Sequence, residues 1–204
     1  MKKNFTITEI SKILKDYKPK INPPKSGYRL ASVFIPFYPD PDDLSLVFTK
    51  RPDHLNSHSG QISFPGGTKD PADKDDLATA LRETKEEIGV DPSNVEVWGQ
   101  LKSGPTVNSN YWVTPFVGLI PFPYPFKLNA YEVERLIIAP LSHLLDPENF
   151  SEDFYSWNNY TYRTQLYTYG QDVIWGLTAR ILNDFLFLLR TGREPKDTDP
   201  LIST

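Results

Sequence analysis

The chain of 204 residues is 39% apolar and 13% aromatic, which is enough to bury the core of one domain. Its 22 basic and 26 acidic residues give a formal net charge of -4, which argues against a nucleic acid polymer as partner. The chain has no cysteine, so disulfides, thiolate metal sites and cysteine nucleophiles are excluded. A metal site would have to rely on carboxylates, the ligands that Mg²⁺ and Mn²⁺ prefer.

The first residues carry lysines but no uninterrupted apolar segment, and no stretch is long enough to span a bilayer. We therefore expect a cytoplasmic protein with no membrane partner. Thr6 and Glu9 form a capping-box pattern, and apolar residues then recur at helical spacing. Residues 18–26 contain three prolines. We expect residues 1–27 to form an N-terminal helix and an extended arm, and we leave open a homodimer in which this segment exchanges.

Strands are predicted where β-branched and aromatic residues cluster, at 28–38, 44–50, 95–101, 111–120 and 135–139. The first two should form a hairpin across the turn at 39–43, and the proline-rich run 121–125 should be a surface loop. Longer helices are predicted at 75–88 and 174–189, each followed by a glycine. The fold class is therefore α+β with a mixed sheet, with one domain over 28–191 and a flexible tail over 192–204.

The predicted helix at 75–88 carries an unusual cluster of acidic residues. At about 100° per residue, Leu77, Leu81, Thr84 and Ile88 share one stripe, and Glu83, Glu86 and Glu87 share another roughly 135° away. Like charges at this spacing cost about 0.2–0.5 kcal/mol per pair. A divalent cation would relieve the repulsion, and Arg82 is placed to orient Glu86. The alternative is that the three glutamates form a solvated face without a ligand.

Residues 82–90, RETKEEIGV, resemble the REUxEExGU core of the Nudix box, where U is a bulky apolar residue. Thr84 replaces an apolar U. The spacing from Gly67 to Arg82 is one residue longer than usual, and a loop with Asp70, Asp73 and Asp75 stands where the box has a glutamate.

A second motif is similar to that of the coenzyme A diphosphatase branch of this family. The branch pattern is LLTxR, then Ser or Ala, an arginine and a glycine at fixed gaps, and FPGG. Residues 47–51 (VFTKR) and 60–67 (GQISFPGG) keep these gaps, whereas Pro52 replaces Ser or Ala and Asn56 replaces the arginine. The resemblance covers about residues 28–189.

The resemblance implies a Nudix-like α/β/α sandwich and an enzyme that hydrolyses a diphosphate linked to another group. It implies that Glu83, Glu86 and Glu87, with the Gly66 carbonyl, hold Mg²⁺ or Mn²⁺. Arg82 would belong to the catalytic set, and the general base would be a helix glutamate or Glu132. Glu132 alone could equally be an exposed loop carboxylate.

The resemblance also points to residues that would bind a coenzyme A-like substrate, namely Lys50, Arg51, Asn56 and Gly67. Arg51 could bind a substrate phosphate or form a salt bridge at a strand end. If the branch arginine contacts phosphate, Asn56 removes a charge-assisted bond of about 1.5–3 kcal/mol, so substrate preference could shift. Aromatic residues that could stack on a base, or simply complete the core, are Tyr124, Phe126, Tyr131, Tyr155, Trp157 and Tyr160.

Three functions stay open at this stage. The first is hydrolysis of coenzyme A or acyl-coenzyme A to 4'-phosphopantetheine and adenosine 3',5'-bisphosphate. The second is the same reaction on ADP-ribose, a dinucleotide or another nucleoside diphosphate derivative, as Asn56 suggests. The third is a ligand-sensing module that keeps the Nudix scaffold without catalysis.

Overall fold

The computed structural model describes residues 5–20, 23–24, 26–39, 41, 43–54, 59–107, 109–158, 160–195 and 201–203. Asn56, a candidate substrate-binding residue, lies outside the described residues. Among the residues described, no helix combines the length and apolar character needed to cross a membrane.

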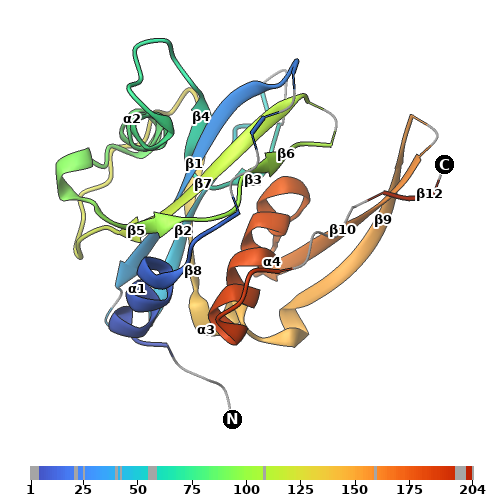
Figure 1. The fold of residues 1–204 in the computed structure, drawn as a ribbon. Helices are drawn as coiled ribbons and strands as arrows, with labels where there is room; N and C mark the ends of the chain where they lie inside the picture. Colours follow the sequence, from blue (N-terminus) through green and yellow to red (C-terminus); the bar gives the residue numbers. More distant parts are fainter. Residues whose placement is uncertain are drawn as a thin grey trace.

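In the described part of the chain, the main sheet comprises eight strands (Figure 1). Its central order is β3, β2, β1, β7, β5, with β4 paired to β1, β6 to β7 and β8 to β2. The strands are β1 (Arg29–Pro39), β2 (Leu44–Lys50), β3 (Ile62–Ser63), β4 (Gly66–Thr68), β5 (Glu96–Gln100), β6 (Gly104–Pro105), β7 (Tyr111–Leu119) and β8 (Arg135–Pro140).

The sheet is mixed, as the sequence predicted. β1 and β7 run parallel, from the pair Arg29–Tyr111 to the pair Phe37–Leu119, whereas β2 and β5 are antiparallel to their neighbours. The β1–β2 hairpin is confirmed by its antiparallel register, which closes at Pro39 and Leu44. The run 121–125 contains no strand and lies in a loop, as predicted.

Helices cover both faces of the main sheet. Because strand side chains alternate between the faces, Phe34 and Tyr38 of β1 pack with α2 (Asp76–Ile88), and Ile35 and Phe37 pack on the other side. That second side is covered by α1 (Ile7–Asp16) and α4 (Gly176–Thr191) (Figure 1). The arrangement agrees with the expected α/β/α layering.

The ends of the helices follow local signals. The capping box of α1 is present. The Glu9 N–H donates to the Thr6 hydroxyl, and the Thr6 N–H donates to the Glu9 carboxylate. Asp75 caps α2, and Gly89 ends it with φ 75°. α4 begins at Gly176 rather than at the predicted residue 174. The reason is that β11 (Asp172–Ile174) pairs with a neighbouring strand up to that point.

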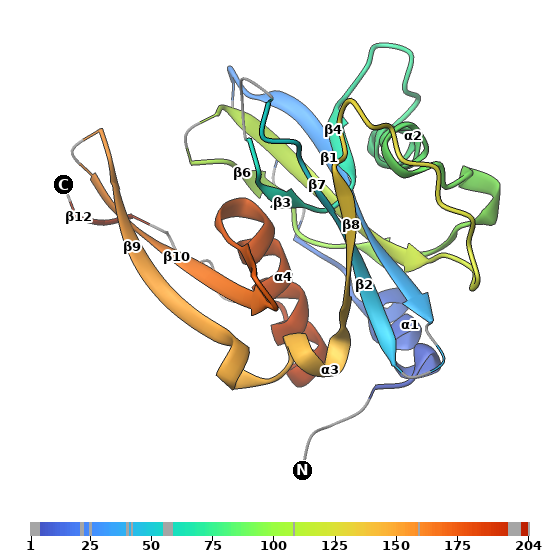
Figure 2. The ribbon, with the colours of Figure 1, turned by 180° about the vertical axis from the view of Figure 1, so that it is seen from behind.

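A second sheet had no counterpart in the sequence prediction. A long hairpin of β9 (Phe150–Trp157) and β10 (Tyr160–Tyr169) carries β11 and β12 (Leu201–Ser203). α4 lies between this hairpin and the main sheet (Figure 2). The connections include α3 (Leu141–Leu144), η1 (Pro92–Asn94) and η2 (Pro147–Asn149).

Parts of the two terminal segments contact the rest of the chain. Ile10 and Leu14 of α1 are buried in the core, and Gly99 of β5 leaves no room for a side chain against Leu14. In the predicted tail, Glu194 contacts Lys102 and the Lys20 backbone N–H, and β12 pairs with β10. The proposed limits of the domain at 28 and 191 remain a prediction.

Candidate active site

The site begins where α2 crosses β4. Gly67 of β4 lies directly beneath Glu83 of α2, and a Cβ at position 67 would come within 2.5 Å of the Glu83 carboxylate. Gly66 has equally little room, because a Cβ there would meet the Ser32 carbonyl and Val33 of β1. Gly67 thus lets the carboxylate-bearing helix approach β4 closely, and Gly66 lets β4 lie close to β1.

Arg82 joins the loop before α2 to the carboxylates of the helix. Its Nε and Nη2 donate to the two oxygens of Asp73, both at 3.0 Å, and Nη2 also donates to the Thr68 carbonyl. Its Nη1 lies 2.9 Å from a Glu83 oxygen and 3.0 Å from a Glu86 oxygen. The predicted contact between Arg82 and Glu86 is therefore present, and Arg82 holds Glu83 as well.

Asp73 is the loop aspartate that anchors this arginine. Its side chain is only 6% exposed, and the Arg82 guanidinium lowers the pKa of Asp73 to about 2. Asp70 and Asp75 instead bind backbone N–H groups of the loop and of α2. The sequence left these three aspartates equivalent, and the structure distinguishes them.

Glu87 is buried rather than exposed on a solvated helix face. The residue is 3% exposed, the Gly66 N–H donates to its carboxylate, and its Oε2 has no hydrogen-bond partner among the described residues. Burial, and next the charges of Glu83 and Glu132, raise the pKa of Glu87 to about 8, while the nearby Arg51 opposes this rise. Burial also raises the pKa of Glu83.

Glu132 reaches the same cluster from the loop before β8. The backbone N–H groups of Lys127 and Asn129 donate to the carbonyls of Ile88 and Glu87 at the end of α2. Glu132 then donates its own N–H to the Asn129 carbonyl at 2.9 Å. The loop is thus docked on α2, and the Glu132 carboxylate is close enough for its charge to act on Glu83 and Glu87.

The donor set suits a hard cation. Glu87 has an oxygen without a hydrogen-bond partner among the described residues, and burial raises the pKa of both Glu83 and Glu87, so a cation that joined them would favour their charged forms. In the part of the chain that is described, no three His, Cys, Asp or Glu side chains already form a ligand set for a metal ion. Arg82 holds Glu83 and Glu86, so these carboxylates would have to turn toward an ion.

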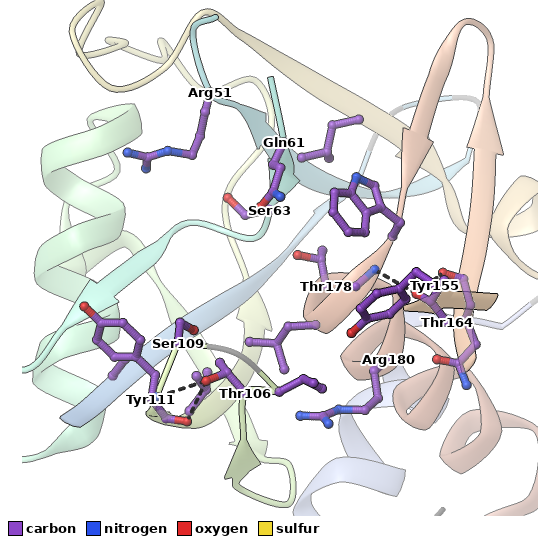
Figure 3. Close-up of a pocket in the computed structure, with 18 of the residues that line it drawn as sticks. Arg51, Gln61, Ser63, Thr106, Ser109, Tyr111, Tyr155, Thr164, Thr178 and Arg180 are labelled. Carbon is purple, nitrogen blue, oxygen red and sulfur yellow. Dashed lines mark hydrogen bonds between the residues drawn. The ribbon is translucent and has the colours of Figure 1, made fainter. Parts of the chain in front are cut away.

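A cavity of about 620 Å³ has Gly67 and Arg51 in its wall (Figure 3). The glutamates do not line it, and Glu83 adjoins it through Gly67. Arg51 forms no ion pair among the described residues, its Nε is buried without a hydrogen bond, and Figure 3 shows its guanidinium directed toward α2. Lys50 is not part of the wall, and its Nζ lies 3.6 Å from a Glu134 carboxylate oxygen. Asn56 lies outside the described residues.

The opposite wall of the cavity comes from residues that the motifs do not contain. They lie on β9, β10 and the start of α4 and include Tyr155, Arg163, Trp175 and Arg180. Among the six aromatic residues considered for base stacking, Tyr155 lines the cavity, whereas Tyr124 and Phe126 pack against the core. Sequence periodicity gave no signal for this wall, since it depends on how the second sheet folds over α4.

The sequence pattern of the Nudix domain matches residues 28–134. The chain is 40% identical over 166 residues to the Uncharacterized Nudix hydrolase NudL of Photorhabdus laumondii, covering 79% of this chain and 87% of that protein. It is 38% identical over 181 residues to the protein of the same name from Escherichia coli K12, covering 87% and 91%.

Solved Nudix structures share the fold. The NUDIX hydrolase of Alicyclobacillus acidocaldarius aligns with a TM-score of 0.54 at 14% identity, over 80% of this chain and 96% of that one. The MutT/nudix family protein of Enterococcus faecalis aligns with a TM-score of 0.51 at 17% identity, over 83% and 64%.

The chain belongs to the Nudix hydrolase family. Members of this family hydrolyse small-molecule diphosphates and generally use divalent metal ions. The glutamates at the contact between α2 and β4 therefore lie in the segment that defines the family.

The first prediction concerns Asp73 as the anchor of Arg82. We expect Asp73→Asn to lower the free energy of unfolding by about 1–3 kcal/mol, because an amide cannot provide two charged acceptors to the guanidinium. Asp70→Asn is the matched control, since Asp70 is exposed and binds a backbone N–H. Equal urea denaturation curves for the two variants would contradict the role of Asp73.

The second prediction concerns Glu87 in the metal-free protein. Its pKa of about 8 in the folded state exceeds the ordinary value of 4.5, so the folded protein holds a proton that the unfolded chain has released. The free energy of unfolding should therefore fall as pH rises between these values. The Glu87→Gln variant should not show the decrease in the free energy of unfolding that Glu87 causes. The Glu96→Gln variant should show the same decrease as the wild type. Urea denaturation between pH 4.5 and 8 measures the free energy of unfolding. The same pH dependence for wild type and Glu87→Gln would refute the prediction.

Proposed function

We propose that the protein hydrolyses the diphosphate bond of coenzyme A or acyl-coenzyme A, giving 4'-phosphopantetheine and adenosine 3',5'-bisphosphate, with Mg²⁺ or Mn²⁺ as the metal. The observation that carries this proposal is the cavity of about 620 Å³, whose wall includes Gly67 beneath Glu83 and Arg51 beside Glu87. A cavity of this size accommodates a ligand larger than a simple diphosphate. The motif at residues 47–51 and 60–67 supports the coenzyme A assignment.

In this proposal Glu83, Glu86 and Glu87, together with the Gly66 carbonyl, would hold the metal ion. The ion would polarise phosphoryl oxygens, neutralise their charge and lower the pKa of a bound water. The protein's part is to hold the carboxylates in place. The hydrogen bonds between Arg82 and Asp73 and the close contact of Gly67 with Glu83 support this role. Arg82 thus acts as a positioning residue.

Hydrolysis requires a group that accepts a proton from the attacking water. We assign this role to Glu132, whose half-buried carboxylate acts electrostatically on Glu83 and Glu87 from a loop hydrogen-bonded to α2. The water oxygen bonds to one phosphorus, and the bond from that phosphorus to the bridging oxygen breaks. The two products are phosphate monoesters, which accounts for all atoms of the diphosphate and the water.

Arg51 is the residue that we propose for binding the diphosphate, because it borders the cavity without a carboxylate partner among the described residues. Lys50 would contribute its charge only after leaving Glu134. The replacement of the branch arginine by Asn56 favours a second candidate, the same hydrolysis on ADP-ribose, a dinucleotide or another nucleoside diphosphate derivative. The homodimer and the cytoplasmic location stay predictions.

The third prediction is tested with a panel of diphosphate compounds. Incubation with Mg²⁺ or Mn²⁺ and mass spectrometry of the products should show 4'-phosphopantetheine and adenosine 3',5'-bisphosphate from coenzyme A. Turnover of ADP-ribose or a dinucleotide without turnover of coenzyme A would instead select the second candidate. Absence of hydrolysis for every compound with either metal would refute both.

Two variants assign the activity to the acidic cluster. Glu86→Gln should lower kcat by at least about 100-fold while the protein stays folded, because its side chain is 53% exposed. Glu96→Gln is the matched control, with a side chain 58% exposed and a lysine as ion-pair partner. Glu132→Gln should lower kcat by about 10²–10⁴-fold. Full activity of Glu132→Gln would move the role of base to a helix glutamate.

A further inference from the structure

The wall of the cavity opposite α2 contains a half-buried arginine that the proposed chemistry does not use. Arg180 lies on the second turn of α4, and its Nη2 donates to the Pro105 carbonyl of β6. Figure 3 shows Arg51 and Arg180 on opposite sides of the cavity, with Arg180 beside Tyr155. The two guanidinium groups could therefore contact different parts of one extended ligand.

Arg180 is a charged group in a poorly solvated place. Burial lowers the pKa of Arg180, but an arginine remains protonated in proteins, so its charge persists. The charges of Asp184 and Tyr155 oppose this effect, and the Nη2 of Arg180 donates to a backbone carbonyl. A half-buried guanidinium that lines a cavity and donates to only one backbone carbonyl keeps donors available for an anionic ligand.

The surroundings of Arg180 suit a polar ligand with a planar part. Tyr155 and Trp175 offer aromatic rings to the cavity, and the hydroxyl-bearing residues Thr106 and Thr178 line it. The Thr164 hydroxyl accepts a hydrogen bond from the Gly176 N–H, which links β10 to the start of α4 and fixes this wall. Arg163 adds a second positive charge, 3.8 Å from Glu152 at the edge of the hairpin.

We propose that Arg180 binds a second phosphate group of the substrate. This group is a phosphate monoester that is separate from the diphosphate and stays intact in the reaction. This inference rests on the proposed function, since the diphosphate occupies the end of the cavity near α2. A guanidinium can grip two oxygens of a phosphate at once, and this geometry gives selectivity for the phosphorylated compound. The wall formed by β9, β10 and α4 then sets substrate preference, while α2 carries the reaction.

The fourth prediction compares substrates that differ only by that phosphate. The pairs are coenzyme A with 3'-dephospho-coenzyme A, and the 2'-phosphate of ADP-ribose with ADP-ribose. For the pair that the protein hydrolyses, wild type should favour the phosphorylated member by about 10- to 100-fold in kcat/KM. Arg180→Met should bring this ratio close to one. Arg180→Lys keeps the positive charge but lacks the paired guanidinium donors, so it should leave an intermediate ratio.

Arg190→Met is the matched control. Arg190 lies on the same helix and also donates through Nη2 to a backbone carbonyl, that of Leu145, but it does not line the cavity. This variant should keep the ratio of the wild type. If Arg180→Met does not fold, the ratio of Arg180→Lys decides. A ratio near one in the wild type, or an unchanged ratio in the Arg180 variants, would overturn the inference.

Failure of the proposed function gives a different result. In that case the wild type hydrolyses none of the four compounds, and calorimetry with adenosine 3',5'-bisphosphate and adenosine 5'-monophosphate decides the inference separately. The inference is supported if the protein binds the bisphosphate at least about 10-fold more tightly than the monophosphate and if Arg180→Lys weakens binding of the bisphosphate. Equal binding of the two nucleotides refutes it.

Discussion

The arrangement of the acidic cluster depends on the guanidinium of Arg82. One side of this group is held by both oxygens of Asp73, and the other contacts Glu83 and Glu86. Such bidentate charged contacts are directional. Asp73, in the loop before α2, therefore fixes the Arg82 side chain, which contacts the helix carboxylates. Gly67 then allows Glu83 to lie against the sheet. Without this network, the repulsion between the glutamates would oppose their close approach.

In the proposed function, the groups that carry the reaction and those that recognise the substrate lie in different parts of the molecule. The glutamates, Arg82 and Arg51 lie in the segment that matches the Nudix domain, residues 28–134. The opposite wall of the cavity comes from β9, β10 and α4, which follow that segment. Under this proposal, changes in the hairpin or at the start of α4 alter the preferred substrate without moving the carboxylates. This agrees with the general observation that one catalytic scaffold serves many substrates.

Local patterns in the sequence predicted most of the main sheet and the helix that carries the glutamates. Asp75 and Gly89 mark the ends of α2 because capping and left-handed backbone are short-range effects. The sequence did not predict the hairpin β9–β10, since β9 (FSEDFYSW) has no regular apolar alternation and only Thr164 and Tyr167 of β10 are buried. The burial of Glu87 and the docking of the Glu132 loop could not be predicted either, because both depend on contacts between distant segments.

The most direct test of the account is anomalous diffraction from a crystal soaked in MnCl₂ at about pH 8, where Glu87 readily ionises. We predict a manganese peak bonded to carboxylate oxygens of Glu83, Glu86 and Glu87 and adjacent to the Gly66 carbonyl, with Arg82 still held by Asp73. A fully soaked crystal with no peak there, or with manganese bound only at other carboxylates, would contradict the account.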